Sequence, residues 1–209
     1  MTGPVIVISG TDTDVGKTVF AAALTAALGA SYWKPIQAGM EAGGDSATVA
    51  ALGGIPDDRI IPEAYRLATP CSPDRAAALD GIAVDPDRLV IPDVSGPLVI
   101  EGAGGLLVPI VDDFLFIHLF KRWKQPVVLV ARTTLGTINH SLLSIEALHR
   151  RKIAIKGIAF VGDSVEHSEA AIARVGGVRH LGRLPFLPTL NGITLAEAFA
   201  ANFDVGDFA

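Results

Sequence analysis

The chain has 209 residues, is 50% hydrophobic and carries a formal net charge of -5 at pH 7. This length and apolar content allow one sizeable core, so we expect a single domain over residues 1–209. The acidic balance argues against a nucleic-acid partner, and the single cysteine, Cys71, excludes an intramolecular disulfide and a cysteine zinc cage. We find no signal core and no apolar run of about 18 residues, and therefore expect a cytoplasmic protein with no membrane partner.

Apolar runs alternate with helical patterns from the first residues onward. This alternation predicts an α/β fold, a mostly parallel sheet with helices on both faces. Ligands bind such sheets at the carboxyl ends of the strands, so the chemistry is expected just after each apolar run. The predicted strands are 5–9, 32–36, 97–100, 127–131 and 157–161, and the predicted helices are 18–28, 45–52, 85–90, 114–123, 139–150 and 165–175.

The first predicted strand leads into Gly-Thr-Asp-Thr-Asp-Val-Gly-Lys-Thr at 10–18. A glycine-containing loop that ends in Gly-Lys-Thr at a helix start is typical of P-loop NTPases, although the glycine at position 10 makes this a longer variant. Loop amides and the positive helix end would face the phosphates. Lys17 would reach the β- and γ-phosphates, and the Thr18 hydroxyl would bind Mg²⁺. An ordinary strand-to-helix turn does not need these three residues, so ATP binding is the favoured interpretation.

The second predicted strand contains Lys34 within an apolar run. An isolated buried ammonium is unfavourable, and a phosphate or carboxylate partner would remove that penalty. The alternative is a lysine that extends to solvent at a sheet edge. Asp45 follows Gly43 and Gly44 and begins a predicted helix, where a plain N-cap is the simpler interpretation of that residue alone.

The third predicted strand ends in Glu101, followed by Gly102, Ala103 and Gly104. A carboxylate at this place is typical of a Mg²⁺ site in nucleotide enzymes, with a structural glutamate as the alternative. Thr18, Asp45 and Glu101 would together supply oxygen ligands.

The fourth predicted strand leads to a Gly-Thr helix start at 136–137. Uncapped amides there can bind an anion. An ordinary Thr or Asn helix cap is an equally natural interpretation of these residues.

Taken in order, the motifs at 10–18, 34–35, 45, 101–105 and 135–140 closely resemble those of the dethiobiotin synthetase family of biotin biosynthesis. The resemblance extends from residue 4 to about residue 187. It implies an ATP- and Mg²⁺-dependent cyclo-ligase. Such an enzyme forms a carbamate from 7,8-diaminononanoate and CO₂, phosphorylates it to a carbamic–phosphoric anhydride, and closes the ureido ring to give dethiobiotin, ADP and phosphate.

The resemblance also implies roles for individual residues. It implies a homodimer in which the helix start at 136–139 serves the neighbouring subunit's site. The implied catalytic residues are Lys34, Lys17 and Thr13, and the metal ligands are Thr18, Asp45 and Glu101. The implied substrate-binding residues are Thr13, Lys34, Ala38, Gly136, Thr137, Ile138 and Asn139. The implied nucleotide-binding residues are Asp14, Val15, Gly16, Lys17, Thr18, Val19, Asp45, Glu101, Gly102, Ala103, Gly104, Gly162, Asp163, Pro185, Phe186 and Leu187.

The chain departs from the family pattern at a few of these positions. Asp14 stands where some members have glutamate, Ala38 where some have a substrate-contacting serine, and Gly162 where an asparagine often reads adenine. The last change removes a side-chain hydrogen bond to the base.

Two other functions compete with this interpretation. One is a related amidoligase, but Cys71 does not lie in a nucleophile elbow and the chain has no room for a glutaminase domain. The other is a nucleotide-switch ATPase of the chromosome-partitioning type, which favours a signature lysine where this chain has Asp12.

Overall fold

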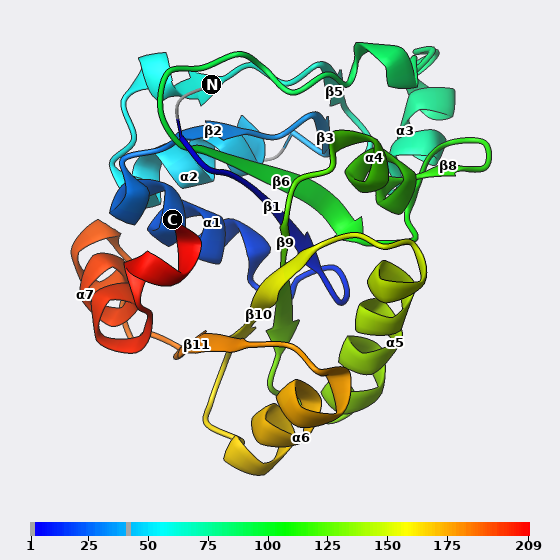
Figure 1. The fold of residues 1–209 in the computed structure, drawn as a ribbon. Coiled ribbons are helices and arrows are strands. Elements are labelled where there is room, and N and C mark those ends of the chain that lie inside the picture. Colours follow the sequence, from blue (N-terminus) through cyan, green and yellow to red (C-terminus); the bar gives the residue numbers. More distant parts are fainter. Residues whose placement is uncertain (1–2, 41–42) are drawn as a thin grey trace.

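The central feature of the computed structural model, which describes residues 3–40 and 43–209, is a seven-stranded sheet of order β11-β10-β9-β1-β6-β2-β4 (Figure 1). Every neighbouring pair in it is parallel, which confirms the predicted fold class. The strands on one side of β1 (β2, β4 and β6) come earlier in the sequence than those on its other side (β9, β10 and β11). Strand β1 therefore lies at a topological switch point. The strands are β1 (Val5–Gly10), β2 (Ser31–Trp33), β4 (Ile60–Ile61), β6 (Leu98–Gly105), β9 (Val127–Arg132), β10 (Ile155–Val161) and β11 (His180–Leu184).

Helices cover both faces of the sheet (Figure 1). Alternate side chains of β1 point to opposite faces, so Ile6 and Ile8 join one buried cluster and Val5 and Val7 another. The first face carries α1 (Lys17–Leu28), α2 (Gly44–Gly53) and α7 (Gly192–Asn202). The second carries α3 (Pro73–Asp80), α4 (Phe116–Trp123), α5 (Thr137–Arg150) and α6 (Glu166–Gly176). Within the described ranges, these helices are too short or too polar to cross a bilayer.

Smaller elements extend the fold beyond the main sheet. Strand β3 (Ile36–Ala38) pairs with β5 (Tyr65–Leu67), and β7 (Pro109–Val111) pairs with β8 (Phe114–Leu115). Short 3₁₀ turns lie at Asp57–Arg59, Pro86–Arg88 and Val205–Phe208.

The predicted strand at 32–36 is wrong as one element. It consists of β2, in the main sheet, and β3, which pairs with β5 instead. Pro35 lies between them, and because proline has no N–H it interrupts the ladder. Lys34 therefore lies at the point where the chain leaves the main sheet.

Other predicted boundaries also change. The predicted strand at 97–100 is β6, which continues to Gly105, so Glu101 lies within the strand and not after its end. The predicted helix at 85–90 is only a 3₁₀ turn, because a segment this short before Pro92 cannot build a stable α-helix. The predicted helix at 114–123 begins at Phe116, after β8. The sequence interpretation missed α3, β11 and α7, whose stability comes from tertiary packing rather than from a strong local pattern.

An aromatic cluster attaches α7 to α1. The ring of Phe199 lies 4.6 Å from that of Phe203 and 6.0 Å from that of Phe20, with Phe208 also in contact. All of these rings are buried. Packing of aromatic rings therefore holds the carboxyl-terminal segment on the helix that follows the phosphate loop.

Replacing Phe199 by alanine should destabilise the fold by about 3–5 kcal/mol, because it opens a cavity among these rings. Urea unfolding followed by circular dichroism measures this change. Ile193, on the same helix but 73% exposed, provides the control, and Ile193→Ala should change stability by no more than about 0.5 kcal/mol. Equal effects of the two variants would contradict the packing role of α7.

Candidate active site

The loop between β1 and α1 folds back on its own lysine. Lys17 Nζ donates a hydrogen bond of 3.0 Å to the backbone oxygen of Asp12. A Cβ added to Gly10 would lie 2.9 Å from Lys17 Nζ, and one added to Gly16 would lie 2.8 Å from Val161. Gly16 also has a φ of 90°, which other residues rarely adopt. These two glycines therefore allow the loop to close tightly over the start of α1.

The start of α1 is suited to an anion. Gly16 is its N-cap, and in the described part of the chain no side chain caps it. The first amides of the helix thus present the positive end of its dipole to the loop. Burial lowers the pKa of Lys17, and the Glu101 carboxylate only partly offsets this effect.

A buried ion-pair cluster lies beside the loop. Lys34 is 3% exposed and Glu101 is fully buried, and Lys34 Nζ lies 3.4 Å from Glu101 Oε1. Lys34 also forms a close ion pair with Asp45 Oδ2. Burial lowers the pKa of Lys34, but the two carboxylates outweigh it and the pKa is raised. The carboxylate partner expected for Lys34 is present, and the lysine does not extend to solvent.

Further polar groups bond to the Glu101 carboxylate and to the backbone of Asp45. The Thr18 hydroxyl donates to Glu101 Oε1 at 2.9 Å, and the Tyr32 hydroxyl donates to Glu101 Oε2 at 2.9 Å. The backbone N–H of Asp45 donates to Gln37 Oε1 at 3.0 Å. Asp45 is not a plain N-cap, because Gly43 caps α2 and the Asp45 side chain pairs with Lys34 instead.

One cavity of about 870 Å³ joins the loop and the ion-pair cluster. It brings together most residues that the sequence placed at the phosphates, the metal and the reacting atoms. Its lining includes Thr13, Asp14, Gly16, Lys17, Thr18, Val19, Lys34, Ala38, Asp45, Glu101, Ala103 and Gly104. Val15 instead packs in the core, and Gly102 lies in β6, where an added Cβ would be 2.9 Å from the Phe120 ring.

The sequence interpretation missed several groups at this cavity. Gln37 and the segment 70–73, which includes Cys71, line it, and Tyr32 lies behind it. The signal for Tyr32 was available, because a phenol inside an apolar strand needs an acceptor when it is buried. Nothing local in the sequence places segment 70–73 here, since the connection from β5 to α3 brings it to the site.

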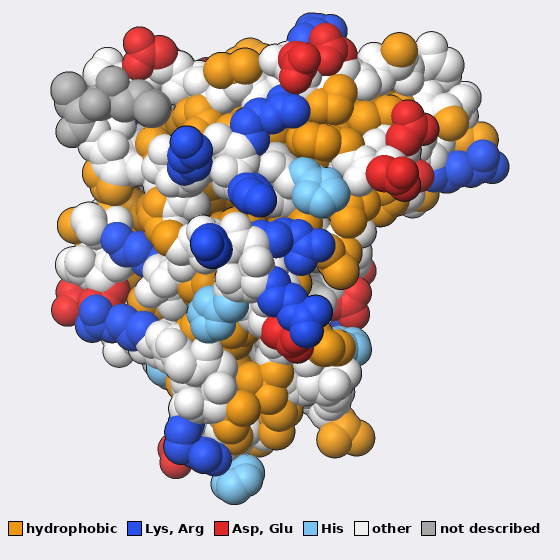
Figure 2. All heavy atoms as spheres, turned by 45° about the vertical axis from the view of Figure 1, so that its right-hand side comes forward, with side chains coloured by type: hydrophobic (Ala, Val, Ile, Leu, Met, Phe, Trp, Pro, Cys, Tyr) orange, Lys and Arg blue, Asp and Glu red, His pale blue; other side chains and the backbone are white. Residues whose placement is uncertain are grey.

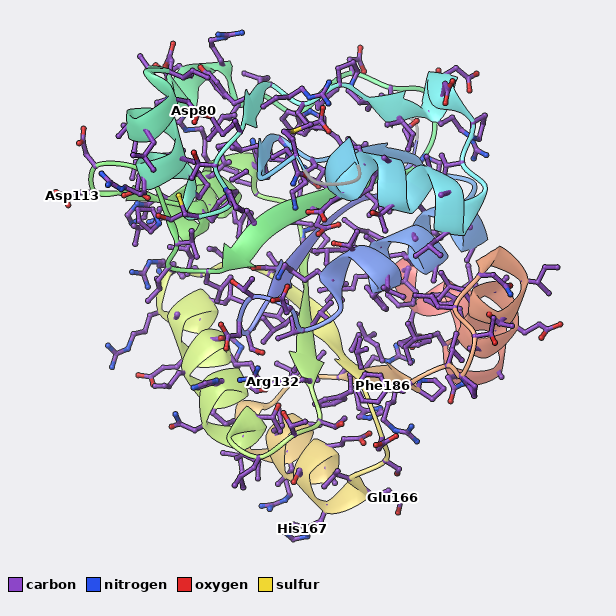
Figure 3. The ribbon with its side chains drawn as sticks, turned by 180° about the vertical axis from the view of Figure 1, so that it is seen from behind. Asp80, Asp113, Arg132, Glu166, His167 and Phe186 are labelled. Carbon is purple, nitrogen blue, oxygen red and sulfur yellow. The ribbon has the colours of Figure 1, made fainter. Side chains whose placement is uncertain are left out.

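The segments expected to hold the base lie together at the ends of β10 and β11. The Gly162 N–H donates to Leu184 O at 3.0 Å, and a Cβ on Gly162 would lie 3.6 Å from the Phe186 ring. Asp163, Pro185 and Leu187 adjoin these residues in the chain. Phe186 is 64% exposed and lies beyond β11, while Arg132 lies at the tip of β9 (Figure 3).

The expected anion-binding helix start lies apart from the large cavity. Gly136, with φ 94°, is the N-cap of α5, and Thr137 Oγ1 donates to the backbone oxygen of Arg132 at 2.5 Å. Gly136, Thr137, Ile138 and Asn139 do not line the large cavity as the described residues define it.

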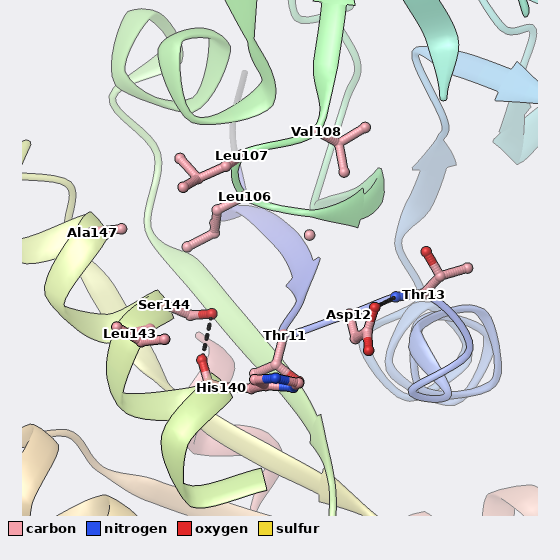
Figure 4. A pocket seen from close by; sticks show the side chains of 11 residues that line it. Thr11, Asp12, Thr13, Leu106, Leu107, Val108, His140, Leu143, Ser144 and Ala147 are labelled. Carbon is pink, nitrogen blue, oxygen red and sulfur yellow. Dashed lines mark hydrogen bonds between the residues drawn. The ribbon is translucent and has the colours of Figure 1, made fainter. Parts of the chain in front are cut away.

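A second cavity lies between α5, the phosphate loop and the end of β6. Its volume is about 360 Å³, and Thr13 lines both this cavity and the large one (Figure 4). Leu106, Leu107, Leu143 and Ala147 give it an apolar wall, and His140 and Ser144 lie at its α5 side.

The residues present fit a hard divalent cation only if a ligand completes the site. Within residues 3–40 and 43–209, no group of three or more His, Cys, Asp or Glu side chains could hold a metal. Glu101 and Asp45 both pair with Lys34, and the Thr18 hydroxyl bonds to Glu101, so these three side chains form a cluster of oxygen donors. Mg²⁺ is commonly held by one or two carboxylates together with substrate phosphates, and this donor set has that composition.

Replacing Lys34 by glutamine should destabilise the protein by about 3 kcal/mol, because the buried Glu101 charge loses its partner. The double variant Lys34→Gln/Glu101→Gln should recover part of that loss, since it removes the unpaired charge. Urea unfolding measures both changes.

Arg150→Gln is the matched control. Arg150 forms an ion pair with Glu146, but its side chain is 76% exposed. The variant should change stability by less than about 1 kcal/mol. A Lys34→Gln variant as stable as this control would contradict the buried ion pair.

Comparison with solved structures supports the fold. The chain superposes on a chain of the MinC:MinD cell division protein complex from Aquifex aeolicus with a TM-score of 0.56 and 16% identity, over 94% of this chain and 86% of that one. It superposes on the cell division ATPase MinD of Pyrococcus furiosus with a TM-score of 0.54 and 14% identity, over 96% and 99%. At this identity the likeness shows a shared P-loop NTPase fold only.

Comparison of sequences shows the family. A family model described as an AAA domain matches residues 5–194. The ATP-dependent dethiobiotin synthetase BioD of Rhizorhabdus wittichii is 60% identical over 204 residues, which cover 98% of each chain. That of Novosphingobium aromaticivorans is 59% identical over 203 residues, covering 97% of this chain and 98% of the relative. With near full-length relatives at this identity, and with a phosphate loop beside the buried Lys34 cluster, the chain belongs to the dethiobiotin synthetase family of P-loop enzymes.

Proposed function

We propose that this enzyme converts 7,8-diaminononanoate, CO₂ and ATP to dethiobiotin, ADP and phosphate. The observation that carries the proposal is the buried Lys34 beside the phosphate-loop Lys17, with both ammonium groups lining one cavity. Relatives that match almost the whole chain carry the name of this activity. The reaction transfers a phosphoryl group to a carbamate, and it therefore needs cations around the developing negative charge.

The proposed sequence of steps begins with one amine of the substrate. It adds to CO₂ and loses a proton, giving a carbamate beside Thr13 and Lys34. A carbamate oxygen then attacks the γ-phosphorus of ATP, the bond to ADP breaks, and a carbamic–phosphoric anhydride forms. The second amine attacks the carbamoyl carbon and loses a proton, phosphate departs, and the ureido ring is closed.

The ammonium groups and helix amides have distinct tasks in this proposal. Lys17 and the amides at the start of α1 hold the phosphates in line with the carbamate. Lys34 contacts the carbamate and the γ-phosphate and stabilises the charge that builds up between them. Its raised pKa supports this task, because the ammonium stays charged at neutral pH.

Thr18, Asp45 and Glu101 are the residues that would hold Mg²⁺ with the nucleotide. The ion would supply further neutralisation of phosphate charge. Glu101 and Asp45 pair with Lys34. The same two carboxylates would therefore hold both the metal ion and the catalytic ammonium group in place. The base would lie against Gly162, Asp163 and the segment 185–187.

Phosphate release from ATP tests the reaction. It should require both 7,8-diaminononanoate and bicarbonate, and mass spectrometry should detect dethiobiotin, because the anhydride forms only on a carbamate. A Lys34→Gln variant should lose at least about a hundredfold in kcat, the scale of removing one transition-state charge stabiliser.

Release that needs neither substrate would favour the nucleotide-switch alternative. That function is already disfavoured by Asp12, whose carboxylate accepts from the Thr13 N–H at 2.8 Å and pairs with Arg132 at 3.2 Å. Release with another acid and ammonia in place of the diamine would favour the amidoligase.

We infer that the active form is a homodimer in which α5 completes the neighbouring site. The helix start at 136–139 lies outside the large cavity of its own chain, as far as the described residues define it. Apolar side chains also gather near it, since Leu107, Leu135 and Leu143 are each more than half exposed. Figure 2 shows hydrophobic areas between basic side chains on the side of α4 and α5. Exposed apolar areas of this kind are typical of protein interfaces.

Mixing two inactive variants tests this arrangement. Asn139→Glu should block the substrate carboxylate by like charge, yet keep α5 stable, since acidic residues favour a helix start. Neither Asn139→Glu nor Lys34→Gln alone should be active. When they are co-expressed, about a quarter of wild-type activity should return, because half of the dimers regain one intact site. No recovery in a sample shown to contain mixed dimers would refute a shared site.

A further inference from the structure

Tyr32 is the fully buried neighbour of the Glu101 carboxylate. It lies in β2, which pairs in parallel with β6 and sets Tyr32 opposite Val99. From there its hydroxyl donates to Glu101 Oε2 at 2.9 Å. The ring itself packs in the core cluster beneath α1. The phenol thus approaches the carboxylate from inside the fold, on the side away from solvent.

The two oxygens of Glu101 therefore have different partners. Oε1 receives the Thr18 hydroxyl at 2.9 Å and lies 3.4 Å from Lys34 Nζ, while Oε2 receives the Tyr32 hydroxyl. A carboxylate is planar, so a bond that holds one oxygen also fixes the direction of the other. Tyr32 thereby orients Oε1 toward the phosphate loop.

The hydroxyl of Tyr32 is the donor in this bond, because a carboxylate oxygen can only accept. Burial and the Glu101 charge both raise its pKa well above the usual value. A protonated phenol can stabilise a buried carboxylate without bringing a second charge into the core. The cluster then keeps Lys34 as the cation that faces the carboxylates.

We propose that Tyr32 is a positioning residue, which holds Glu101 Oε2 so that Oε1 is presented to the divalent cation that accompanies the nucleotide. The inference rests on the metal role that the proposed function gives to Glu101. Partners that orient a metal ligand in this way typically change metal affinity by about 10–100-fold when they are removed.

The test compares Tyr32→Phe with the matched variant Tyr65→Phe. Tyr65 is the second tyrosine of the chain, is 6% exposed, and accepts a 2.9 Å hydrogen bond from the Asp85 backbone N–H. Calorimetric titration with the β,γ-imido analogue of ATP, with and without Mg²⁺, measures how much the cation strengthens binding. The readout does not depend on turnover.

We expect Tyr32→Phe to reduce the Mg²⁺-dependent gain in affinity by about tenfold or more and to leave metal-free binding unchanged. Tyr65→Phe should retain the wild-type gain, although it also loses a buried hydroxyl. A wild-type gain in Tyr32→Phe, together with a lost gain in Glu101→Gln, would overturn the role of Tyr32 and leave the metal site intact. A wild-type gain in Glu101→Gln would overturn the metal assignment itself.

A double variant separates positioning from folding. In Glu101→Gln/Tyr32→Phe the buried charge is absent, so the variant remains testable even if Tyr32→Phe alone unfolds. If Tyr32 acts through Glu101, the double variant should match Glu101→Gln in its Mg²⁺ dependence. A further loss of Mg²⁺ dependence would show that Tyr32 acts by another route and would refute the proposal.

Discussion

The buried carboxylate of Glu101 is the constraint on which the site depends. A charge with no exposure to solvent must be paired and hydrogen-bonded, and here Lys34, Thr18 and Tyr32 together satisfy it. These partners come from β2, the connection after it, and α1. The middle of β6 is therefore tied to β2 on one side and to the start of α1 on the other. The need to compensate the Glu101 charge thus holds β2, β6 and α1 together at the proposed reaction site.

The phosphate loop is built around a second ammonium group, that of Lys17, whose pKa shifts in the opposite direction to that of Lys34. Burial lowers the pKa of Lys17, whereas the carboxylates near Lys34 raise the pKa of that residue. Lys17 bonds to the backbone oxygen of Asp12, a neutral acceptor that a phosphate can replace. In the proposed reaction one lysine is thus held in advance by carboxylates, and the other is free to take phosphate as its partner.

Asp12 anchors the phosphate loop through its side chain. Its side chain bonds to the Thr13 N–H and to Arg132 at the end of β9, which anchors the loop within the same chain. The small cavity beside it is shared by the loop, the end of β6 and α5. In the proposed reaction, the apolar wall there, next to Thr13, would take the alkyl chain of the substrate, and the amines would reach the large cavity. The proposed dimer would bring a helix start to the other end of that substrate.

The sequence by itself determined the parallel α/β fold and the strand–loop–helix order around the phosphate loop, because these follow from hydrophobic periodicity and local spacing. It placed Glu101 after its strand, whereas β6 continues through Glu101 to Gly105. It also identified Lys34, Asp45 and Glu101 as residues of one site. Only the tertiary structure decided how they pair, since Lys34 and Glu101 are 67 positions apart and meet through the strand order. It also decided that Pro35 splits the second strand, that α7 packs on α1 and that Tyr32 lies behind Glu101. Each of these depends on contacts between distant segments, which no local pattern encodes.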